Sequence, residues 1–108
     1  MEKVYNKLIR DRIPEIIIGN GGEPFTRILD DKEYKEELEK KLNEEYQEVL
    51  GATESSDRIE ELADMVEIID ALANLEGKTL DDVIEVQKQK RLKRGGFQKK
   101  IFLEKVVE

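Results

Sequence analysis

The chain has 108 residues and a formal net charge of −7, and 42% of its residues are charged. This length is enough for a single domain, residues 1–108, and the acidic balance argues against non-specific binding of nucleic acid. Cysteine and histidine are both absent, which excludes disulfides, the usual zinc ligands and catalytic triads that depend on imidazole. There is no apolar run of membrane-spanning length and no apolar signal core at the N-terminus, so we expect a soluble, cytoplasmic protein with no membrane partner.

The first predicted elements are a short helix and a short strand. Residues 11–18 (DRIPEIII) predict a helix, because Pro14 is tolerated in a first turn and the glycine-rich residues 19–22 stop it. Residues 25–29 alternate weakly between apolar and polar, which predicts a strand. A lone strand leaves its backbone groups unpaired, so we expect it to pair with the β-prone tail, residues 100–107, in a small sheet.

Three long helices are predicted between these two segments. The first begins with a capping-box pattern at Asp30 and Glu33, the second repeats that pattern at Asp57 and Glu60, and the third has Thr79 as its N-cap. A glycine follows or ends each of them. The predicted bounds are about 31–51, 57–76 and 80–94. The expected fold class is therefore mainly α: an antiparallel bundle of three long helices, with a short N-terminal helix and a small two-stranded sheet.

The second long helix carries apolar residues on two faces. Its stripes are Ile59, Leu62, Val66, Ile69 and Ala73 on one side, and Met65, Ile68, Leu72 and Leu75 on the other. A helix that is apolar on two sides is normally buried on two sides. We therefore expect a homodimer or a higher homo-oligomer that packs through this helix. The alternative is that the N-terminal helix and the tail cover the second face.

Carboxylates fall on faces that the long helices should bury. Glu45 lies on the apolar stripe of the first long helix with Glu48 beside it, and Glu61 and Asp64 lie on the apolar seam of the second. Residues three apart on a helix are neighbours, so two antiparallel helices let the pairs face each other. Four crowded carboxylates do not all stay ionised unaided, and Mg²⁺ or Mn²⁺ with oxygen ligands would neutralise them. The alternative is a set of partly exposed carboxylates paired with lysines.

Charge is segregated along the chain. Residues 30–70 contain 16 acidic and 5 basic side chains, whereas residues 88–100 contain 7 basic and no acidic ones. The basic stretch either holds an anion while the acids hold a cation, or is simply a solvated run of charge.

The carboxylate motif resembles a known signature. Glu44-Glu45-x-x-Glu48, twelve residues and then Glu61-x-x-Asp64 is similar to the EExxE…ExxD pattern of the all-α NTP pyrophosphohydrolases, the MazG-like superfamily. The segments YNKLIRDRIPEII, TRILDDKEY, EELADMVEIIDAL and KRGGFQKKIFL, in this order, resemble its phosphoribosyl-ATP pyrophosphohydrolase-like branch of predicted house-cleaning enzymes for non-canonical nucleotides. The resemblance covers nearly the whole chain.

This resemblance implies Mg²⁺-dependent hydrolysis of a nucleoside triphosphate to a monophosphate and diphosphate. It implies that Glu48, with Glu45 beside it, orients the attacking water or accepts its proton, while Glu44 lies a helical step off the seam. The implied metal ligands are Glu45, Glu48, Glu61 and Asp64. The implied phosphate-binding residues are Lys7, Arg10, Lys90 and Arg94.

Two other functions remain open at this point. One is the phosphoribosyl-ATP pyrophosphohydrolase reaction itself, but that enzyme carries an aromatic residue and a histidine after its ExxD, and Met65-Val66-Glu67 follows Asp64 here. The other is a non-catalytic helical module that binds a nucleotide or a partner protein.

Overall fold

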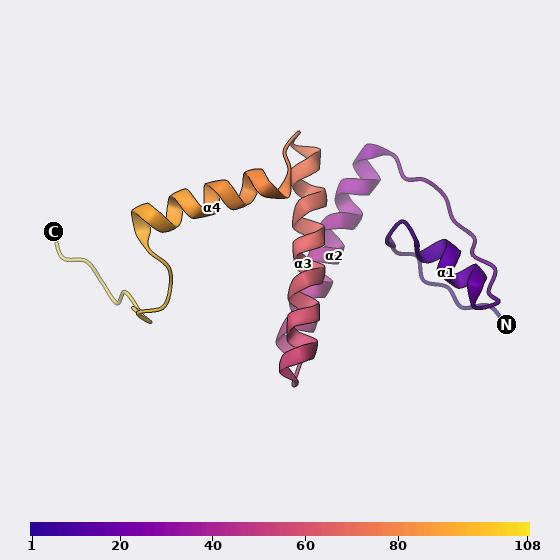
Figure 1. Ribbon diagram of the computed structural model, residues 1–108, viewed down its shortest axis with the longest axis horizontal. Coiled ribbons are helices and arrows are strands. Elements are labelled where there is room, and N and C mark those ends of the chain that lie inside the picture. The colour runs from indigo at the N-terminus through magenta and orange to yellow at the C-terminus, as the bar shows by residue number, and fades with distance from the viewer.

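The computed structural model describes residues 1–108 and contains four helices and no strand (Figure 1). The bounds are α1 Ile13–Gly19, α2 Asp31–Gly51, α3 Ser55–Leu75 and α4 Leu80–Arg94. The existence of all four predicted helices is confirmed, and the bounds of α2 and α4 agree with the prediction at both ends. No helix is both long and apolar enough to cross a lipid bilayer.

Side-chain caps fix the starts of α2 and α4. The backbone N–H of Glu33 donates to Asp30 Oδ1 over 2.8 Å. At α4 the backbone N–H of Asp82 donates to Thr79 Oγ1 over 3.2 Å, and the Thr79 N–H donates to Asp82 Oδ2 over 2.9 Å. These bonds satisfy N–H groups that have no partner within the helix, so the predicted caps are confirmed.

The predicted cap of α3 is wrong. The helix begins at Ser55, before the expected pair Asp57 and Glu60, and its N-cap residue Glu54 makes no side-chain capping bond. Asp57 therefore lies inside the first turn, where a negative charge is favoured by the partial positive charge of the helix N-terminus. The connection from α2 shortens to residues 52–54, and the Arg58 guanidinium braces it by donating to the Ala52 carbonyl over 2.6 Å.

α2 and α3 pack side by side as an antiparallel pair, which forms the centre of the molecule (Figure 1). The three buried residues of the chain all belong to it: Leu38 of α2, and Ile68 and Ala73 of α3. Met65 and Leu72 are half-buried on the same seam of α3. The predicted stripe that contains Met65, Ile68 and Leu72 is thus used within the chain, together with Ala73 at the C-terminal end of the other stripe.

α4 does not complete the predicted bundle. Its first backbone N–H, that of Leu80, donates to Asp70 Oδ1 of α3 over 3.0 Å, and Gly77, with φ of +72°, turns the chain between the two helices. Beyond this joint α4 projects away from the α2–α3 pair (Figure 1) and contains no buried residue. The structure corrects the prediction of a three-helix bundle to a helical pair with an arm. The reason is that α4 is dominated by charged and polar residues and has no wide apolar face to bury.

The predicted two-stranded sheet is also wrong. Residues 25–29 and 100–107 are extended or irregular, and they lie toward opposite ends of a molecule that is 64 Å long (Figure 1). Because α4 carries the tail away from the N-terminal segment, neither segment has a neighbour with which to exchange backbone hydrogen bonds.

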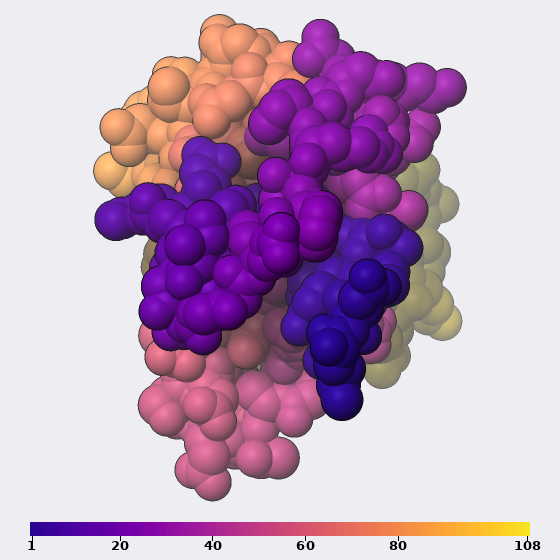
Figure 2. Space-filling model, turned by 90° about the vertical axis from the view of Figure 1, so that its right-hand side faces the viewer, coloured from indigo at the N-terminus to yellow at the C-terminus, as the bar shows by residue number.

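The chain leaves far more surface exposed than a compact monomer does. Its accessible surface is 10,086 Å², against about 6,200 Å² expected for a compact protein of this mass. Its radius of gyration is 18.5 Å, against about 13 Å for a compact domain. The space-filling view shows the loop end of the α2–α3 pair standing clear of the N-terminal segment (Figure 2).

The N-terminal part of the other apolar stripe of α3 belongs to this exposed surface. Ile59 is 63% exposed, and Leu62 and Val66 are also exposed. α1 packs on no other helix, and the tail extends away from α3 (Figure 1). The alternative in which these two segments cover the second face is therefore not realised within one chain.

Candidate metal centre

Three carboxylates from α2 and α3 converge at the seam between the helices. Glu45 of α2 and Glu61 and Asp64 of α3 each offer one carboxylate oxygen, and these oxygens lie within 4.8 Å of one another. All three side chains are half-buried. The spacing of three places Glu61 and Asp64 on the same side of α3, and the antiparallel packing brings Glu45 opposite them.

Crowding and burial disfavour the charged forms of these groups. The pKa of Glu61 is raised to about 7, first by the neighbouring carboxyl of Glu48, then by that of Glu45, and further by loss of solvent. The pKa of Glu45 is also raised, mainly by burial and additionally by the charges of Glu48 and Asp64. Glu48, the fourth predicted metal ligand, is exposed and is not one of the three residues whose oxygens converge. The metal-free cluster therefore binds protons at a pH where ordinary carboxylates do not.

Two buried oxygens of the cluster have no partner. Glu45 Oε2 and Glu61 Oε2 are shielded from solvent, and no hydrogen-bond donor reaches them. An unsatisfied buried acceptor is costly unless a proton or a cation is supplied. A divalent cation suits this donor set, because Mg²⁺ takes oxygen ligands at about 2.1 Å and so holds opposite ligands about 4.2 Å apart. The residues present thus fit a small oxygen-bound ion in chemistry, and their oxygens, within 4.8 Å of one another, would need to draw slightly closer around it.

A basic side chain from the N-terminal segment reaches the same cluster. Arg10 Nη2 donates to Asp64 Oδ1 over 2.7 Å, with 56% and 42% of the two side chains exposed. The sequence singled out both residues, but for different roles, and gave no sign that they touch. Lys7 is not brought there. Its Nζ lies over the Tyr5 ring, 5.6 Å from the centroid.

An open groove of about 420 Å³ adjoins the cluster at the α2–α3 turn. The residues that line it are Glu48, Gly51, Ala52, Thr53, Asp57 and Glu61. It contains three carboxylates and no basic side chain, so it repels a bare polyphosphate. Sequence reasoning missed Asp57 as a member of this groove, although the small residues at positions 51–53 are a signal for an open turn.

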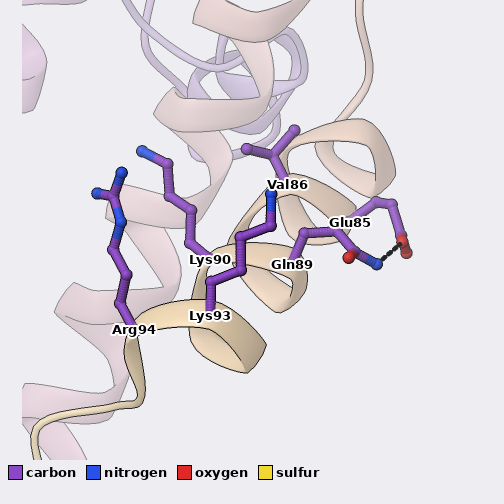
Figure 3. Close-up of a pocket in the computed structure, with 6 residues that line it drawn as sticks. All are labelled: Glu85, Val86, Gln89, Lys90, Lys93 and Arg94. Atoms are coloured by element: carbon purple, nitrogen blue, oxygen red, sulfur yellow. Dashed lines mark hydrogen bonds between the residues drawn. The ribbon is translucent and has the colours of Figure 1, made fainter.

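The remaining predicted basic residues lie elsewhere. Lys90 and Arg94 line a shallow groove of about 320 Å³ along α4, together with Glu85, Val86, Gln89 and Lys93. Figure 3 shows Lys90, Lys93 and Arg94 extending from α4, with the hydrogen bond from Gln89 to Glu85 at one side. Because α4 projects away from the α2–α3 pair (Figure 1), one chain does not bring these residues to its own carboxylates.

A comparison with known proteins gives a partial likeness. The chain is 48% identical over 46 residues to a protein of Mycolicibacterium smegmatis described as uncharacterized. The match covers 43% of this chain and 47% of that protein, so the chain spans about half the length of the relative. No protein-family model matches the chain, and no solved structure matches it. The geometry of the carboxylates is therefore the basis for assigning a function.

Proposed function

We propose that this protein is an Mg²⁺-dependent nucleoside triphosphate pyrophosphohydrolase that converts an NTP and water into an NMP and diphosphate, with non-canonical nucleotides as its substrates. The observation that carries the proposal is the convergence of Glu45, Glu61 and Asp64, with two buried oxygens that lack a partner. The carboxylate motif that resembles the MazG-like superfamily supports the same reaction.

In this proposal each residue has a role that follows from where it lies relative to the cluster. Glu45, Glu61 and Asp64 would hold Mg²⁺, with Mn²⁺ as a substitute. When bound, the ion would neutralise the charge of the triphosphate and make an attached water more acidic. Glu48 is exposed and lines the groove beside the cluster, so its carboxylate is placed to orient a water molecule or to accept its proton, with Glu45 next to it. In-line attack on a phosphorus atom depends mainly on such positioning and on charge, so the absence of histidine is no obstacle.

Phosphate recognition needs positive charge that the groove does not contain. Arg10 is the predicted phosphate-binding residue that lies at the cluster. Lys90 and Arg94 would reach a carboxylate cluster only from a second copy of the chain. Within this proposal the protein acts as a homodimer or a higher homo-oligomer, in which the basic arm of one copy meets the acidic pair of helices of the other.

The exposed surface gives this assembly a physical basis. The excess over a compact monomer is on the order of 3,900 Å² per chain, which is more than the roughly 1,000–2,500 Å² that each partner contributes to a typical obligate interface. The exposed stripe of Ile59, Leu62 and Val66 is the expected centre of the contact. Sedimentation equilibrium of the wild-type chain and of a Leu62→Lys, Val66→Glu variant tests this. We expect an oligomer for the wild type and dissociation, with loss of stability, for the variant. A folded wild-type monomer at micromolar concentration would contradict the assembly.

The reaction is tested by measuring diphosphate release from a panel of canonical and modified NTPs, with Mg²⁺ and with EDTA. We expect metal-dependent release that is strongest for one class of modified base, and equal amounts of NMP and diphosphate. A Glu44→Gln variant is the matched control for substitutions of the cluster residues, since Glu44 is an exposed member of the same motif outside the convergent cluster. Release of inorganic phosphate rather than diphosphate, or tight NTP binding without turnover, would reject the proposed reaction.

A further inference from the structure

The contact between Arg10 and Asp64 links two segments that are far apart in the sequence. It joins residues 54 positions apart, whereas each other side-chain hydrogen bond joins residues ten or fewer positions apart. α1 packs on no other helix. Arg10 is thus the polar tether that ties the N-terminal segment to the α2–α3 pair.

The acceptor of this tether is also a member of the carboxylate cluster. Asp64 receives the Arg10 guanidinium at 2.7 Å and lies among the oxygens that fit a divalent ion. A cation held there would place two positive charges against one carboxylate, and like charges at such short range repel. Arg10 and a metal ion are therefore competitors for the same group.

We propose that Arg10 is a positioning residue that occupies Asp64 while the metal is absent, and that Mg²⁺ displaces it. This inference rests on the proposed function, because it takes the cluster as the Mg²⁺ site. Displacement would release the N-terminal segment and leave the guanidinium without a carboxylate partner, so that it could bind the phosphate oxygens of an incoming nucleotide bidentately. Metal binding and phosphate binding would thereby be coupled through one side chain.

The strength of the contact suits such an exchange. Both side chains are about half exposed, and ion pairs in water contribute little because solvent and salt screen them. A divalent ion with three carboxylate ligands has the greater attraction for Asp64. The neighbouring Arg12 provides a matched comparison, since it pairs with Glu15 within its own segment and does not contact the cluster.

The first test is the affinity for Mg²⁺ alone, measured by isothermal titration calorimetry on Arg10→Gln and Arg12→Gln. Both variants remove one positive charge from the same segment. We expect Arg10→Gln to bind Mg²⁺ about two- to fivefold more tightly than the wild type, the range that an exposed ion pair is worth, and Arg12→Gln to match the wild type. Equal affinities for the two variants, or weaker binding by Arg10→Gln, would overturn the displacement.

The second test keeps Arg10 in place. The chain has no cysteine, so cysteines introduced at the exposed residues Glu2 and Glu39 can carry two spin labels. We expect Mg²⁺ to lengthen and broaden the distance distribution between them, and NaCl at equal ionic strength to change it much less. An unchanged distribution at saturating Mg²⁺ would overturn the proposal while leaving the metal site intact. Absence of any Mg²⁺ binding would instead reject the proposed function, and the displacement with it.

Discussion

Glu45 of α2 and Glu61 of α3 face each other across the helix seam, each with a buried carboxylate oxygen that no donor reaches. Removing an acceptor from water without a partner lowers stability. The pKa of each residue is raised, so that in the metal-free chain a proton on the pair is favoured over two charged carboxylates. The same arrangement makes the pair responsive to both metal and pH.

Mg²⁺ should stabilise the protein. A ligand that binds only the folded state adds about 2.7 kcal/mol to the free energy of unfolding at one hundred times its dissociation constant. Thermal unfolding measured over a range of MgCl₂ concentrations should show a rising Tm for the wild type and for Glu44→Gln. Asp64→Asn should lose most of the rise. A Tm that is the same in MgCl₂ and in NaCl of equal ionic strength would show that the carboxylates hold no ion.

The metal-free protein should lose stability as the pH rises. Glu61 has a pKa of about 7 in the folded chain, against an ordinary value of 4.5. Between these values the folded state binds a proton that the unfolded state has released, so the free energy of unfolding falls with increasing pH. Urea unfolding in EDTA should therefore show higher stability at about pH 5 than at about pH 8. Glu61→Gln should flatten much of this dependence, and a dependence of equal slope in the variant would refute the role of Glu61.

Glu48 should matter to the reaction more than to metal binding. General acid–base catalysis is worth about 10²–10⁴-fold, so we expect Glu48→Gln to lose that much of kcat. Because Glu48 is exposed and lies outside the convergent triad, the affinity of the Glu48→Gln protein for Mg²⁺ should differ only modestly from that of the wild type. Steady-state kinetics and calorimetry on the same preparation separate these effects. Wild-type kcat in Glu48→Gln would remove the residue from the mechanism.

Substitution of Asp64, unlike substitution of Glu48, should weaken metal binding first and lower the activity only as a consequence. It holds both the Arg10 contact and a place among the clustered oxygens. We expect Asp64→Asn to lose Mg²⁺ affinity and, in consequence, activity that high Mg²⁺ partly restores. The measurement is the Mg²⁺ concentration for half-maximal rate, and an unchanged value would contradict the assignment.

The α3–α4 joint should contribute to stability independently of the metal. Thr79→Ala removes the hydroxyl that accepts the Asp82 N–H, and loss of such a cap costs about 1 kcal/mol. Chemical unfolding should report this loss while the affinity for Mg²⁺ stays at its wild-type value. A large change in Mg²⁺ affinity would mean that α4 is coupled to the cluster more closely than its position in one chain indicates.

The sequence by itself determined the helices. Caps at Asp30 and Thr79 and the glycines that follow the helices are local signals, so the ends of α2 and α4 were predictable. The inward carboxylates were predictable as well, because Glu45, Glu61 and Asp64 stand at positions that helical periodicity assigns to a buried face.

Only the tertiary structure decided what these elements contact. The predictions of a two-stranded sheet and of α4 as the third helix of a bundle were wrong. Pairing of residues 25–29 with 100–107 and docking of α4 both depend on where segments distant in the sequence lie. The contact of Arg10 with Asp64 and the unused apolar face of α3 arise for the same reason. Helical periodicity and capping involve residues only a few positions apart. Packing depends on the free energy of burying one surface against another, and a local sequence pattern does not determine that free energy.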